Sequence, residues 1–184
     1  AVAQLMGHPE PDTAAVRWTP QVPCRGDSRT ARLQFAYRGI ADCRAAALIH
    51  GGPKQCVHGC ISLGSCIQIC PVSAIAYNQD GLVQVDPETC ISCGRCVRIC
   101  PTKVMRWIPA GADYLVACNS TEKGPVVKTQ CQVGCIACKK CEKTSSNGGF
   151  HVTNFLSRID YQATGERTAA ADACPTGCIR ALPQ

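Results

Sequence analysis

The stretch Cys90-Ile-Ser-Cys93-Gly-Arg-Cys96-Val-Arg-Ile-Cys100-Pro101 decides the fold of this chain. Its cysteines follow the spacing C-x2-C-x2-C-x3-C-P, which is typical of ligands for [4Fe-4S] clusters in small bacterial electron carriers. The first three thiolates of such a run bind one cluster, and the fourth cysteine ligates a second cluster. The stretch therefore predicts at least two clusters and an electron-transfer protein.

Cysteine is frequent throughout the chain, with 17 among 184 residues, whereas aromatic residues make up only 5%. A chain with so few large apolar side chains needs metals or disulfides to stabilise its core. The odd cysteine count and the run itself argue against a secreted disulfide scaffold, and zinc ribbons pair two distant C-x2-C knuckles instead. We therefore expect folding that depends on iron–sulfur clusters, in a reducing compartment.

The chain contains an internal repeat. Residues 56–108 predict a two-cluster ferredoxin unit, with a hairpin at 74–77 and 82–85 and a closing strand at 104–108. The sequence Cys131-Gln-Val-Gly-Cys135-Ile repeats Cys56-Val-His-Gly-Cys60-Ile and precedes a second expected hairpin, 149–152 with 156–159. The predicted class is α+β, with two tandem bacterial-ferredoxin-like (βαβ)2 units and an N-terminal extension. Boundaries are expected at 1–50 (extension with Cys24 and Cys43), 51–110 (two-cluster domain), 111–130 (linker with Cys118) and 131–184 (one-cluster domain).

The second unit lacks four of its expected ligands. The spacing places them at positions occupied by Ser145, Thr164, Arg167 and Ala170. Because these four positions would have served a single cluster, we predict that one whole cluster has been lost and its neighbour retained. Ser145 as an unusual ligand is the alternative.

The same rule distributes the remaining cysteines. Position 63 is Leu63 where a ligand is expected, so Cys56 is predicted to substitute for it. The predicted iron ligands are Cys56, Cys60, Cys66 and Cys100 for the first cluster, Cys70, Cys90, Cys93 and Cys96 for the second, and Cys135, Cys138, Cys141 and Cys174 for the third. Cys24, Cys43, Cys118 and Cys131 could hold a fourth cluster or be plain buried cysteines, and Cys178 is expected to be a buried apolar thiol.

Several stretches without ligand spacing resemble a known family. They are Cys24-Arg-Gly, Gly39-Ile-Ala-Asp-Cys43-Arg-Ala-Ala, His50-Gly-Gly-Pro-Lys and Lys123-Gly, and they resemble the B subunit of the Rnf ion-translocating ferredoxin:NAD oxidoreductase over roughly residues 15–184. The resemblance implies a multi-cluster subunit that relays low-potential electrons from ferredoxin toward membrane subunits. We do not expect residues 1–184 to include the membrane anchor or the additional cluster domain that are usual in that family. We therefore expect a cytoplasmic chain that reaches the cytoplasmic face of the inner membrane only through partner subunits or a missing anchor.

The remaining features bear on partners. The net charge is +6, and basic residues concentrate between Arg17 and Lys54, which suits either a solvated face or docking of an acidic carrier such as soluble ferredoxin. Nucleic-acid binding is not expected without stacking aromatics.

No dinucleotide loop, P-loop or Ser/His/Asp arrangement is recognisable, so no catalytic site is predicted. The alternatives are a polyferredoxin-like subunit of a soluble oxidoreductase and a module whose clusters only staple the fold or sense redox state.

Overall fold

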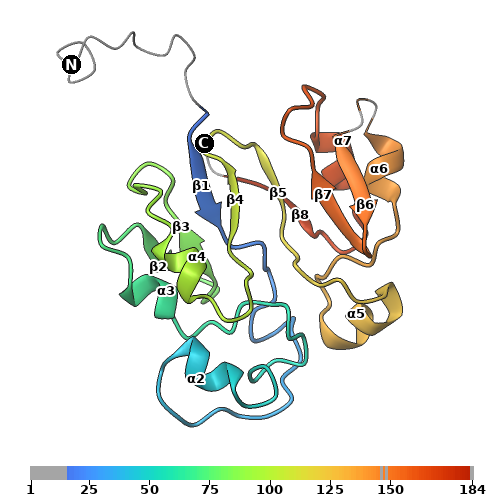
Figure 1. The fold of residues 1–184 in the computed structure, drawn as a ribbon. Helices are drawn as coiled ribbons and strands as arrows, with labels where there is room; N and C mark the ends of the chain where they lie inside the picture. Colours follow the sequence, from blue (N-terminus) through green and yellow to red (C-terminus); the bar gives the residue numbers. More distant parts are fainter. Residues whose placement is uncertain (1–15, 146, 148, 183–184) are drawn as a thin grey trace, which may run out of the picture.

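A computed structural model describes residues 16–145, 147 and 149–182 of the chain (Figure 1). Residues 1–15 of the predicted extension lie outside the described residues. The elements in chain order are β1 (Trp18–Gln21), α2 (Cys43–Ala47), α3 (Ser65–Gln68), β2 (Ile75–Tyr77), β3 (Val83–Val85), α4 (Arg95–Ile99), β4 (Arg106–Pro109), β5 (Tyr114–Val116), α5 (Gly124–Gln130), α6 (Lys140–Thr144), β6 (Phe150–Thr153), β7 (Leu156–Ile159), α7 (Thr168–Asp172) and β8 (Ile179–Ala181). None of the helices in the described part of the chain has the length and apolar character needed to span a bilayer.

The described strands pair as antiparallel two-stranded sheets, and one nesting pattern occurs twice. In the first half β1 pairs with β4, and the hairpin β2–β3 lies between them in the sequence. In the second half β5 pairs with β8, and the hairpin β6–β7 lies between them. Figure 1 shows the first half on the left and the second on the right, with β5 and β8 running between them. Both predicted hairpins and the α+β class are confirmed.

The strand pairing moves the expected boundaries. Residues 18–21, assigned to the extension, form β1, in which Thr19 lies opposite Ile108 of β4. Residues 114–116, assigned to the linker, form β5, in which Leu115 lies opposite Arg180 of β8. Each strand finds its partner far along the chain, and a local pattern of residues does not specify such a partner.

Three helices begin in the same way. A residue with left-handed backbone precedes each one: Gly64 (φ 76°) before α3, Gly94 (φ 71°) before α4 and Lys139 (φ 60°) before α6. Glycine adopts this conformation without steric cost, whereas lysine does not. In all three helices the second residue is a cysteine, namely Cys66, Cys96 and Cys141. The shared turn therefore places one cysteine in the same local setting three times.

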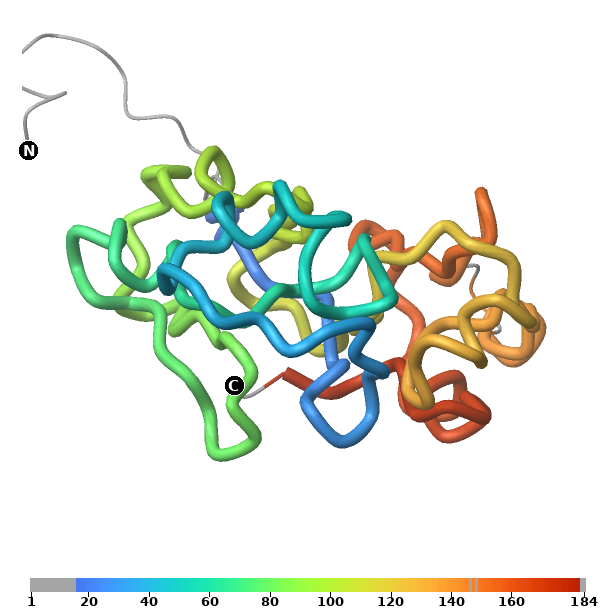
Figure 2. The backbone as a smooth tube through the Cα atoms, turned by 90° about the horizontal axis from the view of Figure 1, so that it is seen from below, coloured from blue at the N-terminus to red at the C-terminus, as the bar shows by residue number. Residues whose placement is uncertain are grey.

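An insertion between β1 and α3 carries the short helix α2. Its first backbone amides donate to the Asp42 carboxylate, from Arg44 at 2.8 Å and from Ala45 at 2.9 Å. Such a cap stabilises a helix start by about 1 kcal/mol. The Cys43 amide donates to the buried hydroxyl of Ser65 at 2.7 Å, which fixes α2 against the start of α3. Figure 2 shows the blue-to-cyan insertion along the underside of the molecule.

Each half has its own core, and cysteine thiols are part of both. The first contains Val85 and Val104 together with Cys60 and Cys96. The second contains Phe150 and Leu156, which are 0% and 1% exposed, together with Cys135, Cys141 and Cys178. The thiols therefore occupy positions that larger apolar side chains fill in ordinary domains of this size.

Candidate iron–sulfur sites

A small apolar cavity lies between the first cysteine loop and the segment that follows α4. Four thiols line it, and we call this group site A: Cys43, Cys60, Cys66 and Cys100. Burial raises the pKa of Cys66 to about 12, and the nearby thiols of Cys60, Cys43 and Cys100 add to the shift. Burial likewise raises the pKa of Cys60 to about 11. Four crowded thiols, two of them in buried and two in partly buried residues, deprotonate readily only when a bound metal centre balances their charge, so the residues present fit a cluster.

Site A differs from the predicted ligand group in one member. Cys56 is predicted to join Cys60, Cys66 and Cys100, but the structure places Cys43 in the wall of this cavity instead. The physical reason is the Asp42 cap and the bond from the Cys43 amide to Ser65, which bring α2 against the cysteine loop. A ligand that arrives from an insertion leaves no regular spacing in the sequence. A signal that could have indicated an ordered segment is Asp42 directly before Cys43, because aspartate is favoured at the start of a helix.

Cys56 lies elsewhere, beside three of the cysteines that the spacing did not assign to the first three clusters. We call this group site B: Cys24, Cys56, Cys118 and Cys131. After burial, the nearby thiols of Cys24 and Cys131 raise the pKa of Cys56. Burial raises the pKa of Cys118 to about 12, and Cys135 and Cys56 contribute further. Cys131 is held by pairing with Ala31, flanked by a bond of 2.8 Å from the Arg32 amide to the Gln130 carbonyl.

Glycines allow the chain to pass close to the site B thiols. A Cβ atom on Gly59 would lie 3.3 Å from the Cys24 sulfur and 3.8 Å from the Cys56 sulfur. One on Gly26 would lie 3.4 Å from the Cys131 sulfur and 3.9 Å from the Cys24 sulfur. A side chain at either position would therefore press against the thiols, and glycine keeps the backbone close to them.

Replacing Gly59 by alanine tests this crowding. The added methyl is expected to lower the iron retained at site B, because it comes within 3.3 Å of the Cys24 sulfur. We expect the purified Gly59→Ala protein to lose up to about four irons per chain, the content of one cluster. Gly111→Ala is the matched control, because a Cβ atom there meets no atom within 4 Å. Full iron content in Gly59→Ala would contradict the arrangement of site B.

A third group, site C, comprises Cys70, Cys90, Cys93 and Cys96. Cys70, Cys90 and Cys96 pack in the core of the first half, whereas Cys93 is exposed. Burial raises the pKa of Cys96 to about 11, and the thiols of Cys90 and Cys93 add to the shift. Backbone amides donate to two of the sulfurs, from Ala74 to Cys70 at 3.3 Å and from Ser92 to Cys90 at 3.4 Å. Such bonds to sulfur are among the contacts that set cluster potentials.

A second small apolar cavity lies in the second half. The thiols in its wall include the predicted ligand group, which we call site D: Cys135, Cys138, Cys141 and Cys174. The two cavities are similar in size and in lining, so both suit the same kind of bound cluster. Among the described residues, no His, Cys, Asp or Glu side chains converge as they would around a single metal ion.

Cys178 also reaches the wall of the site D cavity. It is 1% exposed, as expected for a buried thiol. Its thiol hydrogen bonds with two of the site D sulfurs, which lowers the pKa of Cys174 to about 4 and that of Cys135 to about 6. The Cys178 amide also donates to the Cys174 sulfur at 3.3 Å. Cys178 is therefore a hydrogen-bonding neighbour of site D, a role that the sequence did not predict.

The positions without ligands in the second half are filled by side chains. The Arg167 guanidinium bonds to the Asp113 carboxylate at 2.8 and 3.1 Å and to the carbonyls of Asp160 and Ala163 at 3.1 and 2.7 Å. It also lies 5.7 Å from the centre of the Tyr161 ring. Ala170 is completely buried. Arg167 and Ala170 are therefore both buried at positions where the spacing predicts lost ligands.

Arg167 is expected to stabilise the second half without binding iron. Its side chain is 10% exposed and that of Asp113 is 36% exposed, so the pair is only partly screened by water. Arg167→Met should lower the free energy of unfolding by about 2–3 kcal/mol, since hydrogen bonds to charged groups contribute ~1.5–3 kcal/mol. Denaturant unfolding of the cluster-loaded protein measures this, with the exposed Arg180→Met on β8 as control. Unchanged stability, or a loss of iron, would contradict this role.

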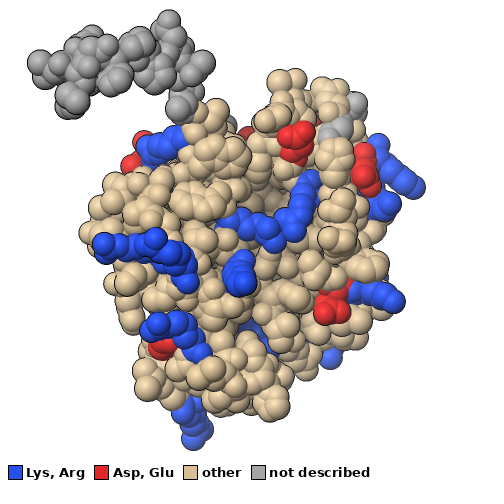
Figure 3. Space-filling model, in the orientation of Figure 1, with Lys and Arg blue, Asp and Glu red and all other residues tan. Residues whose placement is uncertain are grey.

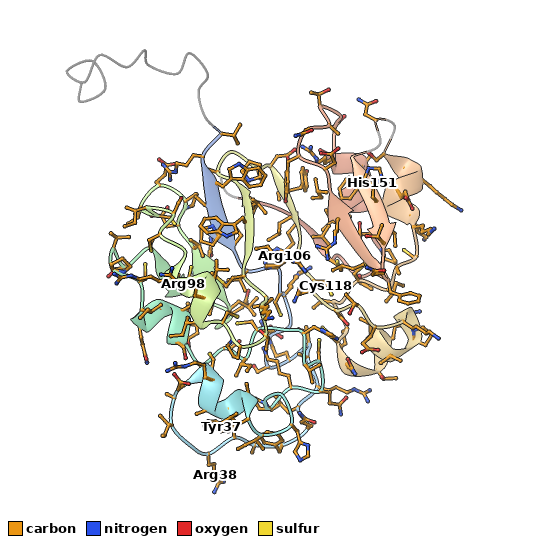
Figure 4. The ribbon with its side chains drawn as sticks, in the orientation of Figure 1. Tyr37, Arg38, Arg98, Arg106, Cys118 and His151 are labelled. Atoms are coloured by element: carbon orange, nitrogen blue, oxygen red, sulfur yellow. The ribbon has the colours of Figure 1, made fainter. Side chains whose placement is uncertain are left out.

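The four sites lie in a definite order. The Cys96 thiol of site C is among the nearby thiols that raise the pKa of Cys66 in site A, and the Cys24 thiol of site B is among those that raise the pKa of Cys60 in site A. Cys118 of site B lies near Cys135 of site D in the same way. Figure 4 shows Cys118 in the middle of the molecule, between the halves. The order is therefore C, A, B, D, with site B between the two halves.

Comparison with known proteins agrees with this chemistry. A family model described as a 4Fe-4S binding domain matches residues 83–106, which include three cysteines of site C and Cys100 of site A. The chain is 42% identical to the B subunit of the proton-translocating ferredoxin:NAD(+) oxidoreductase complex of Clostridium ljungdahlii, over 98% of this chain and 64% of that protein.

Two further relatives carry similar names. The B subunit of the Na(+)-translocating ferredoxin:NAD(+) oxidoreductase complex of Acetobacterium woodii is 38% identical over 97% of this chain and 53% of that protein. The B subunit of the ion-translocating oxidoreductase complex of Methanosarcina acetivorans is 37% identical over 87% of this chain and 61% of that protein. The chain is a homologue of these B subunits. The resemblance stated from the sequence is confirmed, and the chain spans between half and two thirds of the relatives' lengths.

Proposed function

We propose that the chain is an electron relay that holds four [4Fe-4S] clusters at sites C, A, B and D and works as part of a B subunit in an ion-translocating oxidoreductase complex. The observation that carries the proposal is the continuous order of the four cysteine groups through both halves of the molecule. Each cluster, when bound, supplies reversible one-electron transfer. The chain provides the thiolates, keeps all of them except those of Cys93 and Cys138 at least partly buried, and brings neighbouring sites close together.

The nested strands support two tandem ferredoxin-like units. With β1 and β5 included, the first unit extends from β1 to β4 and holds sites C and A, and the second extends from β5 to β8 and holds site D. The contacts of Arg167 with Asp113, Asp160 and Ala163 support the loss of one cluster from the second unit. Site B takes its ligands from the insertion, the first cysteine loop and the segments around α5, and so connects the two units.

A groove between the halves suits an acidic electron carrier, such as a ferredoxin. It is lined by Arg106 of β4, Arg158 of β7 and the exposed Trp107, and Cys118 of site B forms part of its wall. Burial lowers the pKa of Arg106, and the neighbouring charge of Arg158 lowers it further, so the two guanidiniums lie close enough to repel each other. Figure 3 shows Lys and Arg side chains crossing the middle of this face. A carboxylate-rich partner would relieve that repulsion and approach site B.

The experiment that tests the function is anaerobic determination of iron and acid-labile sulfide, followed by redox titration monitored by electron paramagnetic resonance. Four clusters require about 16 irons per chain, and a relay requires that they reduce reversibly and show interacting spins. About 12 irons would leave site B as plain thiols and interrupt the relay between the halves. Clusters that do not reduce would support the alternative of a structural staple.

A further inference from the structure

Lys54 is a cationic residue in the interior of the protein. Lys54 is 8% exposed, and its ammonium group donates three hydrogen bonds. It donates to the Gly26 carbonyl at 2.7 Å, to the Cys60 carbonyl at 2.6 Å and to the Ser62 hydroxyl at 3.2 Å. None of these partners carries a charge. No described carboxylate lies within ion-pair distance of the ammonium, so the described surroundings leave its charge uncompensated.

The three bonds place the ammonium between two sites. Cys60 is a thiol of site A, and Gly26 lies against the Cys131 and Cys24 sulfurs of site B. Burial raises the pKa of Cys60 and of Cys131, and the Lys54 charge opposes the rise in both. One cation therefore acts on thiols of two neighbouring sites. Burying a charge is costly, so its retention at this place calls for a compensating negative charge.

We propose that Lys54 is a shared positive charge that raises the reduction potentials of the clusters at sites A and B. The inference rests on the proposed function, since it requires clusters at both sites. One-electron reduction adds one negative charge to a site, with the electron supplied by an external donor. A fixed cation in a poorly hydrated interior stabilises that added charge more strongly than one in water. Lys54 is a positioning residue that acts through the field it imposes, and it keeps the two middle members of the relay easier to reduce.

The test is the Lys54→Met variant, with potentials measured by anaerobic titration and electron paramagnetic resonance. Signals are assigned by their loss in Cys66→Ala for site A and Cys118→Ala for site B. We expect reduction at both sites to become at least about tenfold less favourable, which is about 59 mV per electron, while sites C and D change little. Lys128→Met is the matched control, because Lys128 is exposed on α5 close to Cys131 and water screens its charge.

A second pair of variants leaves Lys54 in place. Ser62 has a left-handed backbone (φ 65°), which Asp and Asn both tolerate. Ser62→Asp brings a carboxylate to the ammonium and should lower the potential at site A, whereas Ser62→Asn keeps the shape without the charge and should not. Equal shifts at all four sites, or no shift in Lys54→Met and Ser62→Asp, would overturn the proposal. Loss of iron from both of those variants would also overturn it, because Lys54 would then serve folding alone. A wild-type chain with about 12 irons would contradict the proposed function instead.

Discussion

Replacing Cys43 by alanine is expected to remove the same cluster as replacing Cys66 by alanine. Both thiols line the site A cavity, and a cubane with three ligands left is bound far less securely. Cys56→Ala should instead remove the same cluster as Cys118→Ala, because those two thiols belong to site B. Each single variant should lower the iron content from about 16 to about 12 per chain. Iron and sulfide analysis measures the loss, and the missing resonance signal identifies which cluster is gone.

These two pairs of variants distinguish the grouping of cysteines in the structure from the grouping predicted by spacing. If Cys56→Ala and Cys66→Ala lost the same signal, Cys56 would belong to site A and the contacts of Cys43 with α3 would be incidental. Cys178→Ala is the control for burial, because Cys178 is a fully buried thiol beside site D that we expect not to bind iron. This variant should keep its full iron content. A loss there equal to that in Cys174→Ala would make Cys178 a ligand.

The difference between Cys43 and Cys56 shows where spacing stops being informative. The cysteines grouped as site C and as site D lie in compact runs joined by one crossing cysteine, so the spacing alone predicts each group. Site A and site B each contain thiols from separate segments of the chain. Which thiol joins which site depends on the Asp42 cap, on the bond from Cys43 to Ser65 and on the pairing of Ala31 with Cys131. These are tertiary contacts, and regular spacing carries no record of them.

The strands also divide into those that local sequence predicts and those that depend on tertiary contacts. The hairpins β2–β3 and β6–β7 are joined by short turns, so alternating side chains and turn residues predict both. The outer strands β1 and β5 are short, and Pro20 lies within β1. Only pairing with β4 and β8 makes them recognisable as parts of the two halves. The extension 1–50 and the linker 111–130 were therefore predicted as additions to the fold, although each contains one of its strands.

Restoring cysteine at positions 145, 164, 167 and 170 together is expected to add a cluster to the second half. The combined Ser145→Cys, Thr164→Cys, Arg167→Cys and Ala170→Cys variant should gain about four irons per chain. The gain needs the two loops to separate, because a Cβ atom on Gly165 would lie 2.5 Å from that of Asn147. Ala170 is fully buried, so a larger side chain there costs about 1–3 kcal/mol unless a bound cluster reorganises the site. Iron analysis and a new resonance signal measure the outcome.

The matched control keeps Ala170 and changes only the other three positions. It removes Arg167 to the same extent but offers three thiols, so it should bind additional iron poorly and unfold more easily than the parent. A gain in iron only in the fourfold variant would mean that the second half still has the backbone of a two-cluster unit and that ligand loss alone emptied the site. If neither variant gained iron, the contacts of Arg167 with Asp113, Asp160 and Ala163 would have replaced the site in the backbone as well as in the side chains. In that case the relay ends at site D by construction of the fold, and electrons must leave the chain from site D or from the groove beside site B.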